Sequence, residues 1–323
     1  MILNGKDLSA RVKDELKGKI DSFVTKPVLA VIMIGDNEAS KIYIETKKKA
    51  CQYVGISFMT FYYDENENEE TIINKIEELN NEKIVSGIIV QLPLPKKFNE
   101  KNIINAISPS KDVDGLTEIS QGKMLGGKSD FIPCTPKGII KILDVYNIDI
   151  TSKHIVIIGR SNLVGKPLLL ECIKRNATVT ICHSKTKDLE KYTKQADILV
   201  SATGKKHIID KNMIKEGATL IDVGITRENN KIYGDINPNA YEKASSYSPV
   251  PGGVGPMTVV MLLENVYEAY KKQGGITDEI FGWNRKKYNK NISKRNMGKV
   301  HKSGKRIWTH KRKRYYRSMH IRR

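Results

Sequence analysis

A tyrosine and a lysine one helical turn apart are the first residues of this chain whose types and spacing could do chemistry. Tyr43 and Lys47 would share one face of a helix, because positions i and i+4 are neighbours on its surface. There the ring could stack on a flat ligand and hold the amine beside it. Lys47 also belongs to the run Lys47-Lys48-Lys49, which is typical of a solvated helix face. The pair alone therefore leaves a ligand site and an exposed basic face both open.

Gln91 and residues 112–115 place polar groups where predicted strands end. Gln91 follows a short apolar run, and the carboxyl ends of parallel strands face the crevice where such folds bind ligands. The alternative is a structural amide that bonds the loop backbone. Asp112 and Asp114 flank Val113, and a carboxylate here could accept two parallel N–H donors from an aminopyrimidine-like ring. Aspartates before a glycine are also common turn formers, so that interpretation stays open too.

Residues 154–167 predict a strand, a glycine turn and a helix N-terminus in succession. Residues 155–158 form a short apolar, β-branched run of the kind that is buried in parallel sheets. Gly159 permits a tight turn, and Pro167 suits the first turn of a helix. Unpaired N–H groups and the positive end of the helix dipole would then face a phosphate. Because Ser161 replaces the second glycine of the dinucleotide fingerprint, an ordinary strand–helix turn is the alternative.

The elements that must position these residues alternate along the chain. Apolar residues at helical spacing predict helices, and short apolar runs predict strands. The predicted helices are residues 8–23, 38–54, 71–80, 136–146, one from Val164 onward, and 257–270. The predicted strands are residues 27–34, 56–62, 87–90, 155–158, 178–182, 198–201 and 219–223. This order predicts an α/β fold with largely parallel sheets, interrupted by prolines after Gln91 and by a turn-rich segment at residues 249–256.

Composition divides the chain into a nearly neutral body and a basic tail. The 323 residues suffice for two domains, and the formal net charge is +19. Residues 271–323 hold 19 of the 55 Lys and Arg but only 2 of the 36 Asp and Glu. No apolar run predicts a membrane span, the N-terminus does not read as a signal peptide, and the four cysteines lack metal-ligand spacing. We therefore expect a reduced, cytoplasmic protein with no resident metal and no membrane partner.

Seven segments taken together resemble one known family, the bifunctional methylenetetrahydrofolate dehydrogenase/methenyltetrahydrofolate cyclohydrolases. They follow the family's order across nearly all of residues 1–271, and seven in order are far more specific than any one. The segments are Ser40-Lys-Ile-Tyr-Ile-Glu-Thr-Lys47, Gln91-Leu-Pro-Leu-Pro95, Lys111-Asp-Val-Asp-Gly115, Pro133-Cys-Thr-Pro-Lys-Gly138, Gly159-Arg-Ser-Asn-Leu-Val-Gly165, His183-Ser-Lys-Thr186 and Pro249-Val-Pro-Gly-Gly-Val-Gly-Pro-Met-Thr258.

The resemblance implies two αβα domains with a folate cleft between them. It implies a parallel-sheet catalytic domain at residues 1–118, completed by a returning helix at 257–271. A Rossmann-like NADP-binding domain would occupy residues 119–256, and a basic tail residues 272–323. The implied reaction oxidises 5,10-methylenetetrahydrofolate with NADP and hydrolyses the methenyl product to 10-formyltetrahydrofolate. The implied assembly is a homodimer.

The same resemblance implies the site residues, position by position. Lys47 matches the catalytic lysine, Tyr43 the tyrosine over the pterin, Gln91 the partner of the lysine, and Asp114 the aspartate that grips the pterin ring. The other implied substrate contacts are Val90, Leu92, Pro251, Gly252, Gly253, Val254 and Gly255. The implied cofactor contacts are Gly159, Arg160, Ser161, Ser184 and Ile225.

The residues after the second strand of the nucleotide domain favour NADP over NAD. NAD-specific folds place a carboxylate there for the ribose hydroxyls, whereas this chain has Cys182-His183-Ser184-Lys185 and Arg160 nearby. The competing hypothesis is another two-domain, lysine-using dehydrogenase for an amino acid or a shikimate-like acid. That hypothesis leaves Asp114 with Gly115 and the Pro-Gly-Gly loop unexplained.

The tail has no counterpart in the family pattern. Its basic clusters are interleaved with Trp283, Tyr288, Trp308, Tyr315 and Tyr316, an arrangement typical of non-specific single-stranded nucleic-acid binding. The alternative is a disordered extension, or the product of an altered reading frame or of read-through. The high net charge and the lack of sustained apolar periodicity favour that alternative.

Overall fold

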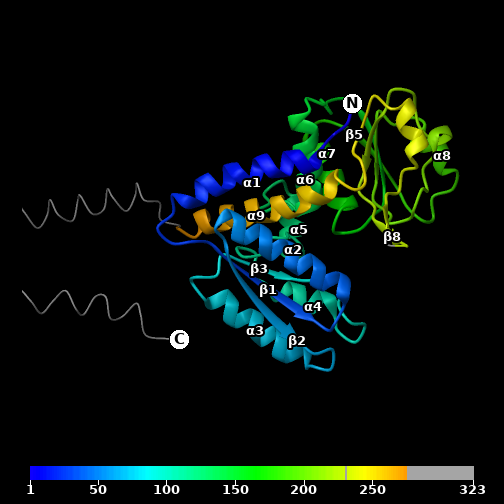
Figure 1. Cartoon of the computed structure of the whole chain (residues 1–323). Helices are drawn as coiled ribbons and strands as arrows, with labels where there is room; N and C mark the ends of the chain where they lie inside the picture. Colours follow the sequence, from blue (N-terminus) through cyan, green and yellow to red (C-terminus); the bar gives the residue numbers. More distant parts are fainter. Residues whose placement is uncertain (230, 275–323) are drawn as a thin grey trace, which may run out of the picture. The chain divides into compact units, whose positions relative to one another are not determined.

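A computed structural model of the chain describes residues 1–229 and 231–274. The predictions of disorder and of nucleic-acid binding for the tail fall outside these residues. Within them, the predicted α/β architecture is confirmed, with two parallel sheets (Figure 1). No helix in this part of the chain is both long and apolar enough to cross a membrane.

The N-terminal domain is built on a three-stranded parallel sheet. Its strands β1 (Val28–Ile34), β2 (Ser57–Tyr63) and β3 (Gly87–Val90) are ordered β2-β1-β3. Leu29, Val31 and Met33 of β1 face α1 (Gly5–Asp21) and α2 (Glu38–Val54), whereas alternate residues face α3 (Glu69–Asn81) and α4 (Glu100–Asn105). Helices cover both faces, which explains why β1 is apolar throughout rather than alternating.

The C-terminal domain is built on a five-stranded parallel sheet in the order β10-β7-β6-β4-β5. The strands are β4 (His154–Ile158), β5 (Thr178–Cys182), β6 (Ile198–Ser201), β7 (Thr219–Asp222) and β10 (Ser246–Tyr247). The helices are α5 (Glu118–Leu125), α6 (Cys134–Val145), α7 (Gly165–Lys174) and α8 (Leu189–Thr193), with 3-10 turns η1 (Lys211–Met213) and η2 (Pro238–Lys243). A small antiparallel hairpin, β8 (Thr226–Glu228) and β9 (Lys231–Tyr233), follows β7. Because these strands are parallel, the carboxyl ends of β4, β6 and β7 lie at the same edge of the sheet.

Helix α9 (Val254–Lys272), the last helix among the described residues, joins the two domains. It packs against α1 of the N-terminal domain and α6 of the C-terminal domain, and Figure 1 shows it in orange beside the dark-blue α1. Met257, Val260 and Leu263 lie in the same apolar core as residues of both sheets. Helix α9 therefore contacts the cores of both domains.

Two helix starts were predicted too late, because one helix was started at its proline and the other directly after a proline. Helix α9 begins at Val254 rather than at 257, so Val254 and Gly255 are its first residues and not loop residues. Helix α6 begins at Cys134 rather than at Pro136. In both, the proline lies within the first turn, where its missing N–H breaks no helical hydrogen bond.

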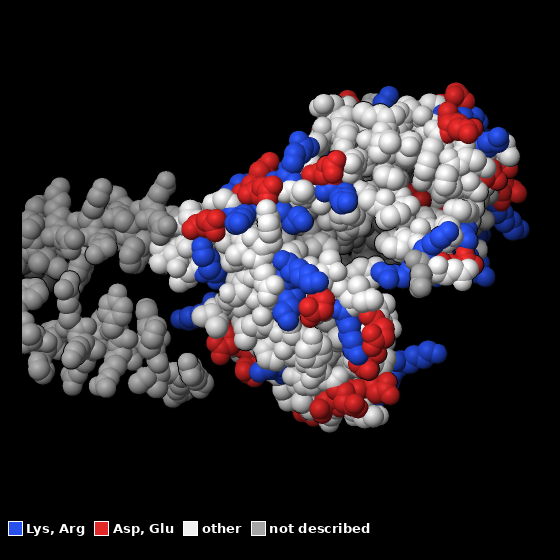
Figure 2. Space-filling model, viewed as in Figure 1, with Lys and Arg blue, Asp and Glu red and all other residues white. Residues whose placement is uncertain are grey.

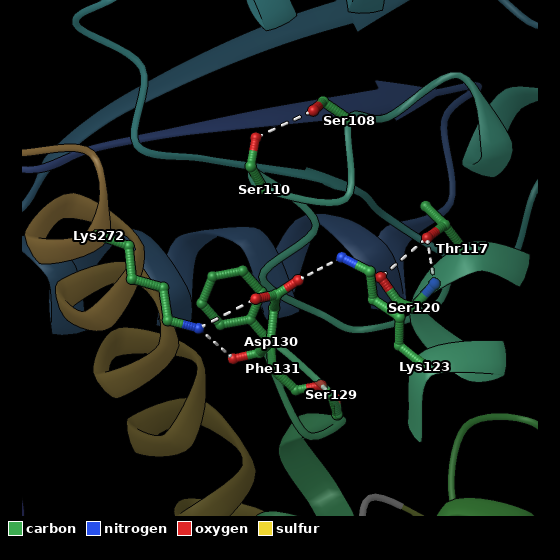
Figure 3. A network of polar contacts seen from close by, with 9 residues as sticks. All are labelled: Ser108, Ser110, Thr117, Ser120, Lys123, Ser129, Asp130, Phe131 and Lys272. Carbon is green, nitrogen blue, oxygen red and sulfur yellow. Dashed lines mark hydrogen bonds and ion pairs between the residues drawn. The ribbon is translucent and has the colours of Figure 1, made fainter. Parts of the chain in front are cut away.

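The end of α9 is fixed to the body by polar contacts (Figure 3). Lys272 Nζ donates to the backbone oxygen of Asp130 at 2.9 Å and lies over the Phe131 ring. Asp130 also pairs with Lys123 at 2.7 Å. The side chain of Gln273 donates to the backbone oxygen of Ser86 at 2.9 Å. Lys272 and Gln273 therefore contact the body, although the tail implied by the resemblance starts at residue 272.

Candidate active site

A cavity of about 390 Å³ lies where the two domains meet, and most of the predicted substrate residues line it. Figure 2 shows the surface hollowed between α2 and the β8 hairpin. The predicted residues that line the cavity are Tyr43, Lys47, Val90, Gln91, Leu92, Asp114, Ile225, Val254 and Gly255. Further residues, for which no role was inferred from the sequence, line the cavity as well: Leu116, Pro133, Cys134, Thr135, Leu163, Val164, Val223, Thr258 and Val259.

Helix α2 carries Tyr43 and Lys47 into the cavity. The helix starts where the Asn37 side chain accepts from the backbone N–H of Ser40 at 3.0 Å, and it ends at Gly55, whose φ is 85°. Lys47 Nζ donates to Gln91 Oε1 at 3.0 Å. Its neighbour Lys48 instead lies 3.6 Å from Glu45 on the surface. The lysine run is thus a solvated face for Lys48, while Lys47 belongs to the cavity.

Gln91 is held in place by hydrogen bonds of its backbone and of its side-chain amide. Its backbone N–H donates to Ile32 at 2.8 Å, which extends the pairing of β3 with β1 by one residue. Its side-chain Nε2 donates to the backbone oxygen of Leu92 at 2.6 Å. This leaves Oε1 to accept from Lys47. Gln91 therefore has both predicted roles, the loop-bonding amide and the partner of the lysine.

The two aspartates of residues 112–115 divide the two interpretations between them. Asp112 is buried and accepts from the backbone N–H groups of Leu116 at 3.1 Å and Thr117 at 2.9 Å, as a turn former does. Asp114 is half-buried and lines the cavity. Burial raises the pKa of the Asp114 carboxyl, and the positive charge of Lys47 opposes the rise. Only Asp114 is free to face a ligand from this turn.

Buried groups of α6 and α9 hold the Asp114 turn in place. The Cys134 thiol donates to Asp114 Oδ1 at 3.2 Å. Burial, together with the Asp114 charge, raises the pKa of that thiol well above its usual value, so it stays protonated. Asn265 is fully buried, and its Nδ2 donates to the backbone oxygens of Val113 at 2.8 Å and Ile132 at 3.0 Å. Asn265 had no sequence signal, because it lies within the apolar face of a helix.

Three predicted substrate residues lie outside the cavity lining. Pro251, Gly252 and Gly253 form the turn that precedes α9. The backbone oxygen of Gly252 accepts from Lys6 at 2.8 Å, and a Cβ on Gly5 would lie 1.9 Å from the oxygen of Gly253. In this structure the turn packs against the start of α1, and of the loop only Val254 and Gly255 reach the cavity.

The predicted phosphate cradle has the backbone that a dinucleotide needs. Gly159 has a φ of 123°, and a Cβ there would lie 2.6 Å from the backbone oxygen of Ala202. A Cβ on Gly165 would lie 2.0 Å from the oxygen of Gly159, so the turn can approach the helix only because both are glycine. Ser161 Oγ accepts from the N–H of Val164 at 3.1 Å. These contacts fit a pyrophosphate above the N-terminus of α7.

The remaining cofactor candidates are exposed at the same edge of the sheet. Arg160 and Ser161 follow β4, and Ser184 follows β5. Ile225 is 40% exposed and lines the cavity together with the substrate candidates. Within residues 1–229 and 231–274, no group of three or more His, Cys, Asp or Glu side chains is placed to hold a metal ion.

Comparison with known proteins identifies both halves of this arrangement. The family model of the tetrahydrofolate dehydrogenase/cyclohydrolase catalytic domain matches residues 3–114, and that of its NAD(P)-binding domain matches residues 133–274. The bifunctional protein FolD of Mycoplasma capricolum is 52% identical over 279 residues, which cover 84% of this chain and 98% of that protein.

Solved structures agree with the sequence comparison. The Campylobacter jejuni FolD methylenetetrahydrofolate dehydrogenase/cyclohydrolase is 44% identical, with a TM-score of 0.83 over 84% of this chain and 99% of that one. The Trypanosoma brucei enzyme, solved with NADP and an inhibitor, is 29% identical with a TM-score of 0.81 over 84% of this chain and 97% of that one. The family models match residues 3–114 and 133–274, and the structure has a cavity between the two domains and a glycine cradle. The chain belongs to the tetrahydrofolate dehydrogenase/cyclohydrolase family.

Proposed function

We propose that this chain oxidises 5,10-methylenetetrahydrofolate to 5,10-methenyltetrahydrofolate with NADP and hydrolyses the product to 10-formyltetrahydrofolate. The family, and relatives that carry both activities in their names, support this proposal. The observation that carries it is the contact of Lys47 Nζ with Gln91 Oε1 in a cavity that also holds Asp114. A proton-transfer group and a pterin anchor thus share one cavity beside the dinucleotide cradle.

Binding and orientation account for the oxidation step. Asp114 would accept two parallel hydrogen bonds from the aminopyrimidine edge of the pterin, and Tyr43 would stack on the flat ring. Nitrogen lone pairs on both sides of the methylene carbon help it to give up a hydride. NADP, when bound, supplies the acceptor for that hydride. The chain's task in this step is to hold the reacting groups in line and to exclude water.

Hydrolysis needs proton transfer, and Lys47 is the cavity group placed for it. Water adds to the carbon of the methenyl cation, and protons must then leave the oxygen and reach a nitrogen as the ring opens. Cys134 keeps its proton, because burial raises the pKa of its thiol well above the usual value. Gln91 accepts from Lys47 and so points its Nζ into the cavity. Lys47 is therefore the general acid and base, and Gln91 orients it.

The end of β5 supports the choice of NADP. The residues that follow the strand are His183, Ser184 and Lys185, with no carboxylate to take the ribose hydroxyls. Arg160 lies exposed in the first turn after β4. A guanidinium and a hydroxyl suit a ribose phosphate. Neither is the negatively charged acceptor that suits the ribose hydroxyls of NAD.

Two assays of the purified chain test the proposal. Reduced cofactor should form with methylenetetrahydrofolate and NADP, and more slowly with NAD. The methenyl compound should be consumed faster than in buffer alone, with no cofactor added. A chain that oxidises a shikimate-like acid or an amino acid and leaves methylenetetrahydrofolate untouched would establish the competing dehydrogenase instead. A clear preference for NAD would contradict the role given to Arg160 and Ser184.

The surroundings of the reaction belong to the same proposal. The four cysteines are free and buried, which suits the reducing cytoplasm. Family membership favours a homodimer that serves one-carbon metabolism, including purine, methionine and histidine biosynthesis. Light scattering of the purified chain measures its mass directly, and a mass near 36.5 kDa would contradict the dimer.

A further inference from the structure

Two carboxylates are fully buried at the cofactor edge of the C-terminal sheet, although neither lines the cavity. Asp222 is the last residue of β7, and Asp235 lies two residues after β9. Both are 0% exposed. Burying a carboxylate is costly unless donors surround it, so two of them side by side require a structural reason.

Asp235 is surrounded by donors from the segment that follows β6. Its Oδ2 accepts from Ser201 Oγ at 2.8 Å, from the N–H of Thr203 at 2.7 Å and from Thr203 Oγ1 at 2.8 Å. Its Oδ1 accepts from the N–H of Lys205 at 2.8 Å. Four charge-assisted hydrogen bonds thus hold residues 201–205 in a single conformation.

Asp222 holds Asp235 in turn. Its two oxygens accept from the backbone N–H groups of Asp235 at 3.0 Å and Ile236 at 2.9 Å. Two glycines make room for the pair. A Cβ on Gly224 would lie 1.8 Å from Asp235 Oδ1, and a Cβ on Gly234 would lie 2.0 Å from Asp222 Oδ2. The ends of β6, β7 and β9 are therefore tied together through these carboxylates.

The tied segments are the ones that touch the cofactor cradle and the cavity. The backbone oxygen of Ala202 is the atom that a Cβ on Gly159 would meet, so residues 201–205 lie directly against the phosphate turn. Val223 and Ile225, which follow Asp222, line the cavity. Asp235 thus lies behind the surface on which the nicotinamide end of a dinucleotide would rest, without being part of it.

We propose that Asp235 is a positioning residue for the dinucleotide, which it serves by fixing residues 201–205 and Ile225 against the Gly159 turn. This inference rests on the proposed function, and it separates the two reactions. Dehydrogenation needs the cofactor surface, whereas hydrolysis needs only Lys47 and the folate anchors. Asparagine cannot replace the aspartate, because its single carbonyl oxygen cannot accept from donors on both sides and its NH₂ would face an N–H or O–H donor.

The test uses the full chain with Asp235→Asn. Calorimetry should show NADP binding about tenfold or more weaker, as expected when a charged acceptor is lost. The KM for NADP should rise by a similar factor, while hydrolysis of the methenyl compound without cofactor stays within about twofold of the unaltered chain. The matched control is Asp197→Asn at the opposite edge of the same sheet, where the carboxylate accepts from the His154 N–H at 2.9 Å. NADP binding should not change in this control.

Ser201→Ala keeps the inference testable if Asp235→Asn does not fold. Ser201 Oγ bonds only to Asp235 among the described residues, so this variant removes one donor and should weaken NADP binding about two- to threefold. Unchanged NADP binding in whichever variant folds would overturn the inference, as would equal loss of both activities. Because calorimetry needs no folate, failure of the proposed reaction would appear in the activity assays and leave this result readable.

Discussion

Consecutive lysines on α2 have different side-chain contacts, and these contacts distinguish Lys47 from its neighbour Lys48. Lys47 lies one turn from Tyr43 and reaches Gln91 on the neighbouring strand, whereas Lys48 pairs with Glu45 on the surface. The sequence alone left Lys47 as a member of a charge run. The resemblance to a family singled out Lys47. The structure gives the physical reason for its contact: β3 ends one residue before Gln91, and the Gln91 side chain reaches Lys47 on α2.

Lys47→Met should abolish hydrolysis of the methenyl compound while folate still binds. Methionine preserves much of the length of the lysine side chain but cannot carry a proton, so the cyclohydrolase rate should fall by about 100-fold or more. A cyclohydrolase assay and a folate-binding measurement on the same preparation check this. Lys48→Met is the matched control and should leave both unchanged. Hydrolysis near the unaltered rate in Lys47→Met would remove Lys47 from its role.

Asp114→Ala and Asp112→Ala should have different consequences, although only Val113 separates the two residues. Asp114 would anchor the pterin, so its loss should raise the KM for folate in both reactions without a large change in melting temperature. Asp112 instead satisfies two backbone N–H groups, so its loss should lower the free energy of unfolding by about 1–3 kcal/mol. Steady-state kinetics and thermal unfolding of both variants check this contrast. An unchanged folate affinity in Asp114→Ala would exclude it from the site.

Elements with a clear apolar face or run were predictable from the sequence, even when they are short, and elements without one were not. Helix α2 and strands β3, β5 and β6 have the predicted bounds, because an apolar face or run of sufficient length identifies them. Helices α4, α5 and α8, the β8–β9 hairpin and β10 were missed. Each is short, and α4 and α5 start at side-chain caps, Asn99 and Thr117, which hold too few residues in place to create a periodic pattern.

The site shows the same division between elements with a local signal and elements without one. Tyr43, Lys47, Gln91 and Asp114 belong to motifs, and the fold brings all four to one cavity. Asn265 lies on α9 among apolar residues, and nothing in the sequence separates its polar side chain from ordinary core neighbours. Cys134 and Thr258 lie in segments that match the family, but no role in the site was inferred from the sequence for either side chain. Their importance arises from the packing of α9 on α6, which no local pattern encodes.

The carboxyl end of β7 should make stability depend on pH. Burial raises the pKa of Asp222 from 3.8 to about 7, and the nearby Asp235 adds to the rise against the opposing backbone N–H groups. Because the pKa in the folded state is the higher one, the stabilising contribution is full below pH 4 and is lost as the pH rises through 7. Between these values the free energy of unfolding should fall by at most about 1.4 kcal/mol per pH unit on this account.

Urea unfolding at pH 5 and pH 8 measures this contribution. Asp222→Asn cannot ionise, so the difference in stability between the two pH values should shrink relative to the unaltered chain. The variant should also be less stable at pH 5, because its NH₂ would face the N–H groups that Asp222 accepts from. An identical pH dependence in the two proteins would show that Asp222 does not titrate in this range.

Charge is distributed over the whole molecule in two different ways. On the body, Lys, Arg, Asp and Glu are intermixed over the face seen in Figure 2. Residues 271–323 instead hold 19 basic and 2 acidic side chains. The family models end at residue 274, and the side chains of Lys272 and Gln273 contact the body. The matched family domains therefore lie within the body, and residues 275–323 of the basic tail lie beyond them.

Deletion of residues from Gly274 onward should leave both folate activities and the melting temperature unchanged. The truncated chain keeps Gln273 and its contact with Ser86. Filter binding of single-stranded RNA should show weak binding by the full chain only, with an affinity that collapses as salt rises, because counterion release supplies it. Loss of catalysis on truncation would place the tail in the enzyme's fold. Tight, salt-resistant binding to one RNA sequence would make it a recognition module.

The return of α9 also determines the order in which this protein can mature on the ribosome. Domains usually fold one after another from the N-terminus as they are synthesised. Here Val266, Ala269 and Tyr270 of α9 share a core with Leu8, Val12 and Ile44. The apolar core of the first domain is therefore incomplete until the second domain and α9 have been translated. The nascent N-terminal half must expose that apolar face throughout synthesis of the nucleotide domain. During this stage of biosynthesis, chaperones have a surface to bind.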